Sequence, residues 1–248
     1  MLTPRYIIGF TGHRSGIDEA VVRSALNDAL VGFQELAAKN SGRAELYSSV
    51  AEGSDTLCVE TARQLNMPVH ILLPMDELEF ASDFTSAEAW LRSNRQIERA
   101  RQRPCRDSVH QAPGETERPD CYFNQGMHIL SAADILVAVW DGLPARGLGG
   151  TAEVVEQAIA IGIPVLQIDP RTGAVSMIGE ISSNFAPDPV IAQLNRLESQ
   201  RMTERISASD PDSLQTRLDK IAMEEASRFR PSLVRIILLH GTAALLAA

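Results

Sequence analysis

The sequence has little cysteine, few aromatic residues and none of the short motifs that identify the commonest enzyme classes. Its 248 residues include three cysteines, Cys58, Cys105 and Cys121, which lie far apart and form no C-x-x-C pair. No histidine stands at metal-ligand spacing from them, so we expect neither a disulfide framework nor a metal site. A reducing cytoplasm is the compartment that this cysteine usage favours.

Missing motifs and the charge balance exclude several classes of function. There is no G-x-x-x-x-G-K-[ST] loop, no H-E-x-x-H and no nucleophile elbow. The first predicted strand–helix turn also lacks the G-x-G-x-x-G run of hydride-transfer enzymes, and we predict no cofactor. The net charge of −9 disfavours a broad basic surface, so we expect no extended nucleic-acid binding. A local basic pocket for a small anion is compatible with that charge.

Short apolar runs alternate with amphipathic helical segments through the first 170 residues. The runs that read as strands are 6–10, 44–49, 69–73, 135–140 and 165–168. Helical patterns begin after Asp18 and cover 54–65, 119–132 and the residues after 151. Alternation of this kind predicts an α/β fold, a Rossmann-like doubly wound parallel sheet of about five main strands. We expect a helical insertion and a helical C-terminal extension in addition.

Polar and glycine residues follow three of these strands, at the edge where a parallel sheet gathers its ligand-binding loops. The first loop offers a hydroxyl, backbone donors and a guanidinium that can hold phosphate, and its candidate residues are Thr11, Gly12, His13 and Arg14. Small residues in the second loop fit a backbone pressed against a ligand, and its candidates are Ser49, Ala51, Glu52, Gly53 and Asp55. The alternatives are a histidine held by its own loop and a helix cap at Ser54 or Asp55.

The third loop carries the strongest signal. Asp141 ends a strand and is placed for ribose hydroxyls, while Gly149, Gly150 and Thr151 open a helix. The first N–H groups of a helix lack intrachain partners and attract phosphate. Glu153 lies one turn further, where it can bind ribose, act at an anomeric carbon or only interact with the helix dipole. Trp140 and Tyr122 can stack on a base or pack in the core.

Together the three loops resemble the SLOG superfamily, which unites the Smf/DprA DNA-processing proteins with the LOG hydrolases. Residues 48–55 are similar to the S-G-x-A-x-G-x-D signature of the DprA branch, with Ser49 where glycine is usual. Residues 147–153 are similar to the P-G-G-x-G-T-x-x-E signature of the LOG branch, and Thr-Gly-His-Arg after the first strand is typical of bacterial members. The resemblance covers about residues 5–170 and implies a nucleotide-binding domain.

One departure concerns the catalytic glutamate of the LOG hydrolases. That residue stands three positions after the threonine, which is Val154 in this sequence, and Glu153 comes one position early. Nucleoside deoxyribosyltransferases also have their acid at the later position. The resemblance therefore implies binding more strongly than hydrolysis, and Glu153 is the catalytic candidate only if the protein is an enzyme.

Outside this domain the sequence divides into an insertion and two C-terminal parts. Residues 76–116 begin acidic and continue with six arginines, which indicates a solvated surface helix or a lid over the crevice. We expect 171–230 to be a partly helical connector and 231–248 to be an apolar segment, either the start of a membrane helix or a terminal packing helix.

Together these features predict a cytoplasmic sensor domain that binds a nucleotide or an ADP-ribose-like signal and passes it to an effector, with 231–248 as the candidate contact with a membrane. Sensor-type SLOG proteins imply this arrangement and a homodimer. The alternative is an enzyme that cleaves a nucleotide N-glycosidic bond.

Overall fold

The computed structural model describes residues 4–112, 117–144 and 149–179. The chain divides into two compact units, Thr3–Pro187 and Met1–Leu2 with Asp188–Ala248, and every described residue belongs to the first. Most of the predicted connector and all of the apolar segment 231–248 lie outside the described residues. Within the described part, no helix combines the length and apolar character needed to cross a bilayer.

Seven strands and six helices make up the described part of the chain. The strands are β1 (Arg5–Gly12), β2 (Arg43–Ser48), β3 (Val69–Leu73), β4 (Ser108–Gln111), β5 (Ile135–Val139), β6 (Val165–Ile168) and β7 (Val175–Ile178). The helices are α1 (Glu19–Lys39), α2 (Ser54–Gln64), α3 (Glu77–Ala81), α4 (Ala87–Arg101), α5 (Arg118–Ala132) and α6 (Thr151–Ala160).

The sheet is doubly wound, as the sequence predicts. Its strand order is β4-β3-β2-β1-β5-β6-β7. All neighbours pair in parallel except β6 and β7, which are antiparallel. The chain moves outward from β1 to β4 and then returns to β5 on the other side of β1. Strand order therefore reverses between β1 and β5, which is where such sheets bind ligands.

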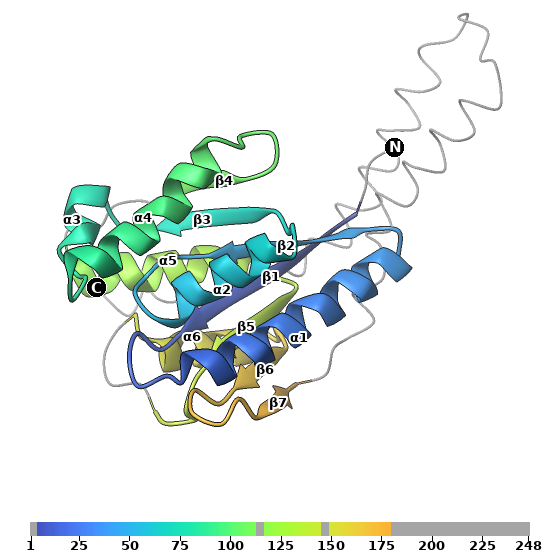
Figure 1. Ribbon diagram of the computed structural model, residues 1–248. Helices are drawn as coiled ribbons and strands as arrows, with labels where there is room; N and C mark the ends of the chain where they lie inside the picture. The colour runs from blue at the N-terminus through green and yellow to red at the C-terminus, as the bar shows by residue number, and fades with distance from the viewer. Residues whose placement is uncertain (1–3, 113–116, 145–148, 180–248) are drawn as a thin grey trace, which may run out of the picture. The chain divides into compact units, whose positions relative to one another are not determined.

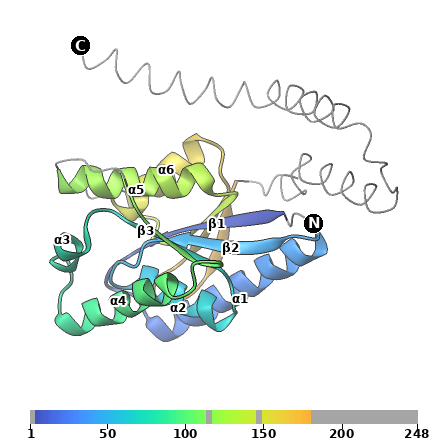
Figure 2. The same ribbon diagram turned by 90° about the horizontal axis from the view of Figure 1, so that it is seen from above.

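Helices cover both faces of this sheet (Figures 1 and 2). Helices α1, α2 and α4 lie on one face, and α5 and α6 lie on the other. Helix α1 begins after Asp18, whose carboxylate accepts from the N–H groups of Ala20 and Val21. Its buried residues recur at helical spacing toward the sheet and are Val22, Leu26, Leu30, Phe33 and Ala37.

The insertion 76–116 adds an edge to the sheet as well as helices. It holds α3, α4 and β4, and β4 pairs with β3. Helix α4 packs against α2 and β4. The sequence analysis missed β4 because it has only four residues, Ser-Val-His-Gln, with a single apolar side chain and no buried residue.

Candidate functional site

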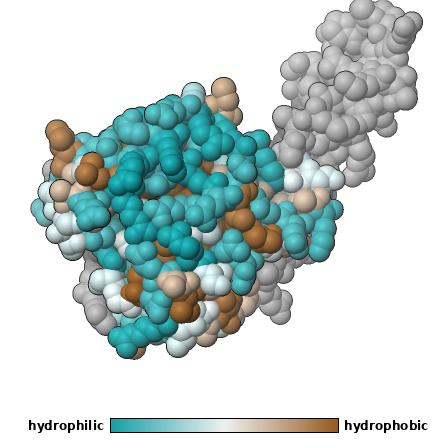
Figure 3. Space-filling view, in the orientation of Figure 1, coloured by the Kyte–Doolittle hydropathy of each residue, from teal (hydrophilic) through white to brown (hydrophobic). Residues whose placement is uncertain are grey.

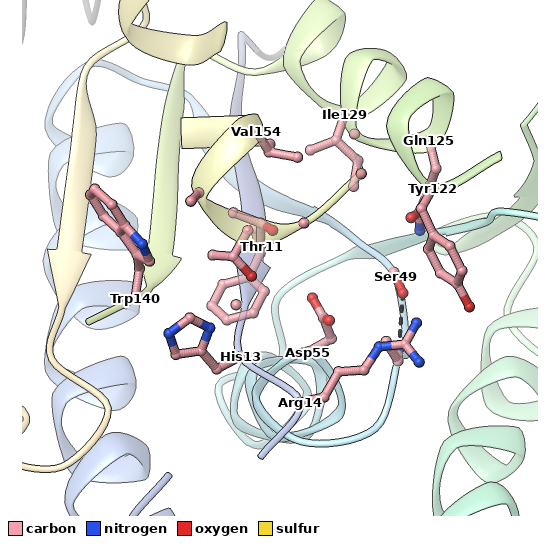
Figure 4. A pocket seen from close by; sticks show the side chains of 18 of the residues that line it. Thr11, His13, Arg14, Ser49, Asp55, Tyr122, Gln125, Ile129, Trp140 and Val154 are labelled. Carbon is pink, nitrogen blue, oxygen red and sulfur yellow. Dashed lines mark hydrogen bonds between the residues drawn. The ribbon is translucent and has the colours of Figure 1, made fainter. Parts of the chain in front are cut away.

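A cavity of about 410 Å³ lies at the carboxyl ends of β1 and β5, where the strand order reverses. Its walls come from the loops after β1, β2 and β5, from the N-terminus of α6 and from one side of α5 (Figure 4). The three loops that the sequence singled out therefore meet at one place. Parallel strands bring this about because their carboxyl ends all reach the same edge of the sheet.

The loop after β1 is fixed against the N-terminus of α2. The carbonyl of His13 accepts from the N–H of Ser54 at 3.1 Å and from its Oγ at 2.8 Å. Gly53 precedes the helix with φ +92°, and a Cβ there would lie 2.4 Å from the carbonyl oxygen of Arg14. Only glycine fits that backbone conformation and that distance. Gly53 thus serves loop packing, and it does not line the cavity.

Arg14 supplies the cationic side of the cavity. Its guanidinium carbon lies 4.8 Å from the centre of the Tyr122 ring, within the range of a cation–π contact. The Tyr122 hydroxyl donates to Asp83, which holds the ring in place. Figure 4 shows the Arg14 side chain reaching toward Tyr122. A guanidinium held in this way is prepared for a planar, two-point contact with phosphate.

The N-terminus of α6 forms the opposite wall. Gly149, Gly150, Thr151 and Ala152 all line the cavity. The N-cap is Gly150, which offers no side-chain hydrogen bond, so Thr151 is the first helical residue and does not cap. Uncapped N–H groups and the positive end of the helix dipole make such a terminus an anion site.

Glu153 does not line the cavity, whereas its neighbour Val154 does. The Glu153 Oε2 atom accepts from the N–H of Gly149 at 2.5 Å. Val154 is 4% exposed and lines the cavity wall. The one-position shift seen in the sequence therefore places an apolar side chain where the LOG resemblance has its glutamate.

His13 and Asp141 join the first and third loops. The Nε2 atom of His13 lies 3.1 Å from Oδ1 of Asp141, and that same Oδ1 accepts from the N–H of Leu143. Trp140 follows β5 and donates its indole N–H to the carbonyl of Leu143 at 2.8 Å. Trp140 and Asp141 both line the cavity.

Asp55 is a buried carboxyl at the floor of the cavity. It is 6% exposed and stands in the first turn of α2. Burial raises the pKa of Asp55 to about 7, and the positive charge of Arg14 opposes that rise. A carboxyl of this kind exchanges its proton near neutral pH, whereas an ordinary aspartate is ionised there.

Most of the predicted binding residues line this one cavity, and three do not. Those that line it are Thr11, Gly12, His13, Arg14, Ser49, Ala51, Asp55, Asp141, Gly149, Gly150 and Thr151. Gly53 packs against the backbone of Arg14, and Glu153 accepts a hydrogen bond from the N–H of Gly149. The Glu52 carboxylate accepts from the N–H of Thr85 at 2.8 Å and from its hydroxyl, so it ties the second loop to the insertion.

Apart from Tyr122, sequence reasoning did not anticipate the contribution of α5. Gln125, Gly126 and Ile129 line the cavity from that helix. The amide of Gln125 donates to the carbonyl of Leu72 at 2.6 Å, which anchors the helix to β3. Nothing in the helical pattern distinguishes residues that face a cavity from residues that face the core. No residue of the insertion lines the cavity among those that the structure describes.

No group of three or more His, Cys, Asp and Glu side chains gathers at metal-binding distance among residues 4–112, 117–144 and 149–179.

Comparison with known proteins gives matches in structure and none in sequence. No family model and no curated protein matches the sequence. The structure is similar to that of DNA processing protein A (DprA) from Streptococcus pneumoniae, with a TM-score of 0.44, 16% identity and coverage of 78% of this chain. The match spans 56% of that protein, a little over half of its length. The Helicobacter pylori DprA is similar at a TM-score of 0.41 and 15% identity, over 78% of this chain and 73% of the other. Both likenesses, to proteins named DNA processing protein A, are likenesses of fold.

One of these findings corrects an expectation. We expected no extended nucleic-acid binding because of the net charge of −9. The Helicobacter pylori protein is described by its single-stranded DNA binding mode, so that expectation is wrong as an exclusion. The physical reason is that binding to a phosphate backbone depends on the cations at the contact and not on the total charge of a chain.

Proposed function

We propose that the protein binds a phosphate-bearing nucleotide in the cavity between β1 and β5. The observation that carries this proposal is the pairing of the uncapped α6 N-terminus with Arg14 across one cavity of about 410 Å³. Backbone N–H groups at Gly150 to Ala152 and the Arg14 guanidinium are the two kinds of donor that hold phosphate most strongly.

The rest of the cavity suits a nucleoside. Trp140 and Tyr122 supply aromatic surface that a base can stack on, and Asp141 supplies a carboxylate acceptor for ribose hydroxyls. A volume near 410 Å³ falls in the ordinary range for small-molecule sites. The ligand class that uses all of these groups is a nucleotide or an ADP-ribose-like compound.

The direct test is calorimetric titration of the purified full chain with AMP, ADP, ADP-ribose, NAD and a cyclic dinucleotide, with a single-stranded oligonucleotide as a further ligand. We expect Arg14→Gln to weaken binding of the preferred nucleotide by about tenfold or more. A hydrogen bond to a charged group contributes about 1.5–3 kcal/mol, and 1.4 kcal/mol is a factor of ten.

A matched control separates this site from general charge effects. Arg106 is an exposed arginine that does not line the cavity, and Arg106→Gln makes the same change in net charge. Equal weakening in both variants, or no binding of any nucleotide by the wild-type protein, would overturn the proposal. Binding of the oligonucleotide alone would replace the nucleotide with a nucleic-acid partner.

The second candidate function is cleavage of a nucleotide N-glycosidic bond, and Asp55 is the observation that favours it. Glu153 does not line the cavity and is bonded to the N–H of Gly149, whereas Asp55 lines the cavity with a pKa of about 7, which suits proton transfer near neutral pH. Chromatography of the same incubations for free base decides the matter. Base release that is lost in Asp55→Asn would identify an enzyme, and intact ligand throughout would leave a binding protein.

A further inference from the structure

A second hollow, separate from the first cavity, lies between α1, α2 and α4 on the other face of the sheet from α5 and α6. Its volume is about 420 Å³, and its eight lining residues include five arginines. The lining residues are Arg23 from α1, Glu60, Arg63 and Gln64 from α2, and Arg92, Arg95, Gln96 and Arg99 from α4. It shares no residue with the cavity at β1 and β5. Figure 3 shows a hydrophilic surface over α2 and α4.

Carboxylates neutralise only part of this positive charge. Glu60 accepts from Arg23 at 3.0 Å and from Arg92 at 2.8 Å. Arg92 also pairs with Glu19, and Arg63 pairs with Asp107 at 2.7 Å. Arg95 and Arg99 form no ion pair with any residue in the described ranges. The hollow therefore keeps a surplus of cations in a protein whose net charge is −9.

The paired arginines make the hollow rigid. Nε of Arg92 donates to Oε1 of Glu60 and Nη2 of Arg92 donates to Oε2, both at 2.8 Å. This two-point contact fixes the guanidinium plane. The Arg63 side chain is 6% exposed and also donates to the carbonyl of Gln96 at 3.1 Å. An anion that enters thus meets cations already held in position, which lowers the entropic cost of binding.

The base of the hollow contains polar atoms whose hydrogen bonding is incomplete. Nε of Arg63 and Oε1 of Gln96 are buried without a hydrogen-bond partner among the described residues. Buried polar atoms are nearly always paired with protein, water or a bound group. These two atoms belong to residues that line the hollow, so its polar wall has hydrogen-bonding capacity that the described residues do not satisfy.

We propose that this hollow binds an anion with two or more phosphate groups, through Arg95 and Arg99. Residues four apart on a helix lie about 5–6 Å apart at Cβ, so the two side chains leave the same face of α4, and both line the hollow. Each guanidinium can hold one phosphate group by two parallel hydrogen bonds, and Arg63 and Arg92 supply fixed positive charge behind them. The proposal is independent of the nucleotide assigned to the first cavity.

The test uses inorganic tripolyphosphate as the probe, titrated into the full chain carrying Arg14→Gln, so that the first cavity contributes little. We expect tripolyphosphate to bind, and to bind more weakly as sodium chloride is raised from about 50 to 200 mM. Adding Arg95→Gln and Arg99→Gln together is expected to weaken binding by about tenfold or more. Both side chains are exposed, so the fold tolerates the change.

The matched control lies on the same helix. Arg101 faces Glu77 and Glu98 outside the hollow, and Arg101→Gln should leave tripolyphosphate binding unchanged. Replacing Arg95 and Arg99 with lysine should restore part of the affinity, because charge returns without the planar fork. A parallel titration with ATP shows whether the bound phosphate groups belong to a nucleotide or to an inorganic polyphosphate. A similar loss for ATP in the double variant assigns a nucleotide phosphate chain, and binding of tripolyphosphate alone assigns an inorganic one.

Two results would overturn the proposal. The first is binding of tripolyphosphate that is as strong in the double variant as in Arg101→Gln, which would mean that Arg95 and Arg99 take no part in it. The second is no binding of tripolyphosphate by the Arg14→Gln protein, whether or not a single-stranded oligonucleotide is retained.

Discussion

The carboxylate of Glu153 accepts a hydrogen bond from the main-chain N–H of Gly149, four residues earlier, at 2.5 Å. This contact closes the loop after β5 onto the first turn of α6. Gly149 itself has φ +76°, and a Cβ there would lie 2.7 Å from Cβ of Tyr122 and 2.8 Å from the carbonyl of Pro119. Glu153 therefore holds Gly149 against α5, and Gly149 in turn lines the cavity.

Replacing Glu153 with alanine should lower the free energy of unfolding by about 1–3 kcal/mol. The variant loses a hydrogen bond to a charged group and a negative charge at the positive end of a helix dipole. Urea denaturation monitored by circular dichroism measures the change. Glu156→Ala on the same helix is the control, because Glu156 is exposed. A loss no larger in Glu153→Ala than in Glu156→Ala contradicts the role we give to this contact.

The loops of the site could be predicted from the sequence, and the partners of their side chains could not. Apolar strand runs followed by glycine and polar residues placed Arg14, Asp55 and Asp141 at one sheet edge, and all three line the cavity. Glu52 binds Thr85, which lies 33 positions along the chain in the insertion. A contact of that kind depends on tertiary packing, and no local pattern in the second loop predicts it.

The fold, like the site, could be predicted from the sequence only in part. Five strands carry buried or nearly continuous apolar runs and were found from the sequence. The two that were missed, β4 and β7, have four residues each, and β7 is largely exposed at the edge of the sheet. An exposed strand gains its stability from pairing with a neighbour and needs no hydrophobic pattern of its own. Sequence periodicity detects burial, so it does not detect such strands.

Alanine at Gly53 should destabilise the protein strongly, whereas alanine at Gly16 should not. Both glycines have positive φ, +92° and +73°. A Cβ at position 53 would meet backbone atoms of Arg14 at 2.4 to 2.8 Å, and a Cβ at position 16 has no atom within 4 Å. We expect a cost of about 1 kcal/mol for Gly16→Ala and at least twice that for Gly53→Ala. Thermal unfolding of the two variants compares them, and equal midpoints would contradict the packing of the loops after β1 and β2.

Glu45 on β2 should stabilise the protein above about pH 4.5 and lose that effect in acid. It is fully buried, and burial favours its protonated form, but hydrogen bonds from His70, Arg5 and Arg43 outweigh burial and lower its pKa to about 2. A folded-state pKa below the unfolded value means that stability falls as pH drops from about 4.5 to 2.

Glu45→Gln tests this effect directly. The variant leaves the two arginines without their carboxylate, and since both are about half exposed we expect a cost of about 1–3 kcal/mol at pH 7. Denaturant titrations at pH 7 and at pH 3 measure it. The difference in free energy of unfolding between Glu45→Gln and the wild-type protein should be smaller at pH 3 than at pH 7. An equal difference at both pH values would contradict the buried ionised state of Glu45.

Asp55 should have the opposite dependence on pH, and it links stability to ligand binding. Its folded-state pKa is raised to about 7, above the unfolded value near 4, so the folded protein binds this proton more tightly than the unfolded chain does. Stability should therefore fall as pH rises from about 4 to 7 and level off above. Asp55→Asn keeps the shape, removes the charge and should be more stable than wild type at pH 8 by roughly 2 kcal/mol, with a smaller gain at pH 5.

The same ionisation opposes an anion in the cavity. Wild-type affinity for a phosphate ligand should decline as pH rises through 7, because the Asp55 carboxylate then faces the bound phosphate, and Asp55→Asn should remove most of that decline. Calorimetric titrations at pH 6 and pH 8 measure both proteins, with Asp28→Asn on the exposed side of α1 as the control. If the affinity of Asp55→Asn declines with pH as steeply as the affinity of the wild-type protein, the pH dependence belongs to another group, the ligand phosphate included. Asp55 would then have no part in the binding equilibrium.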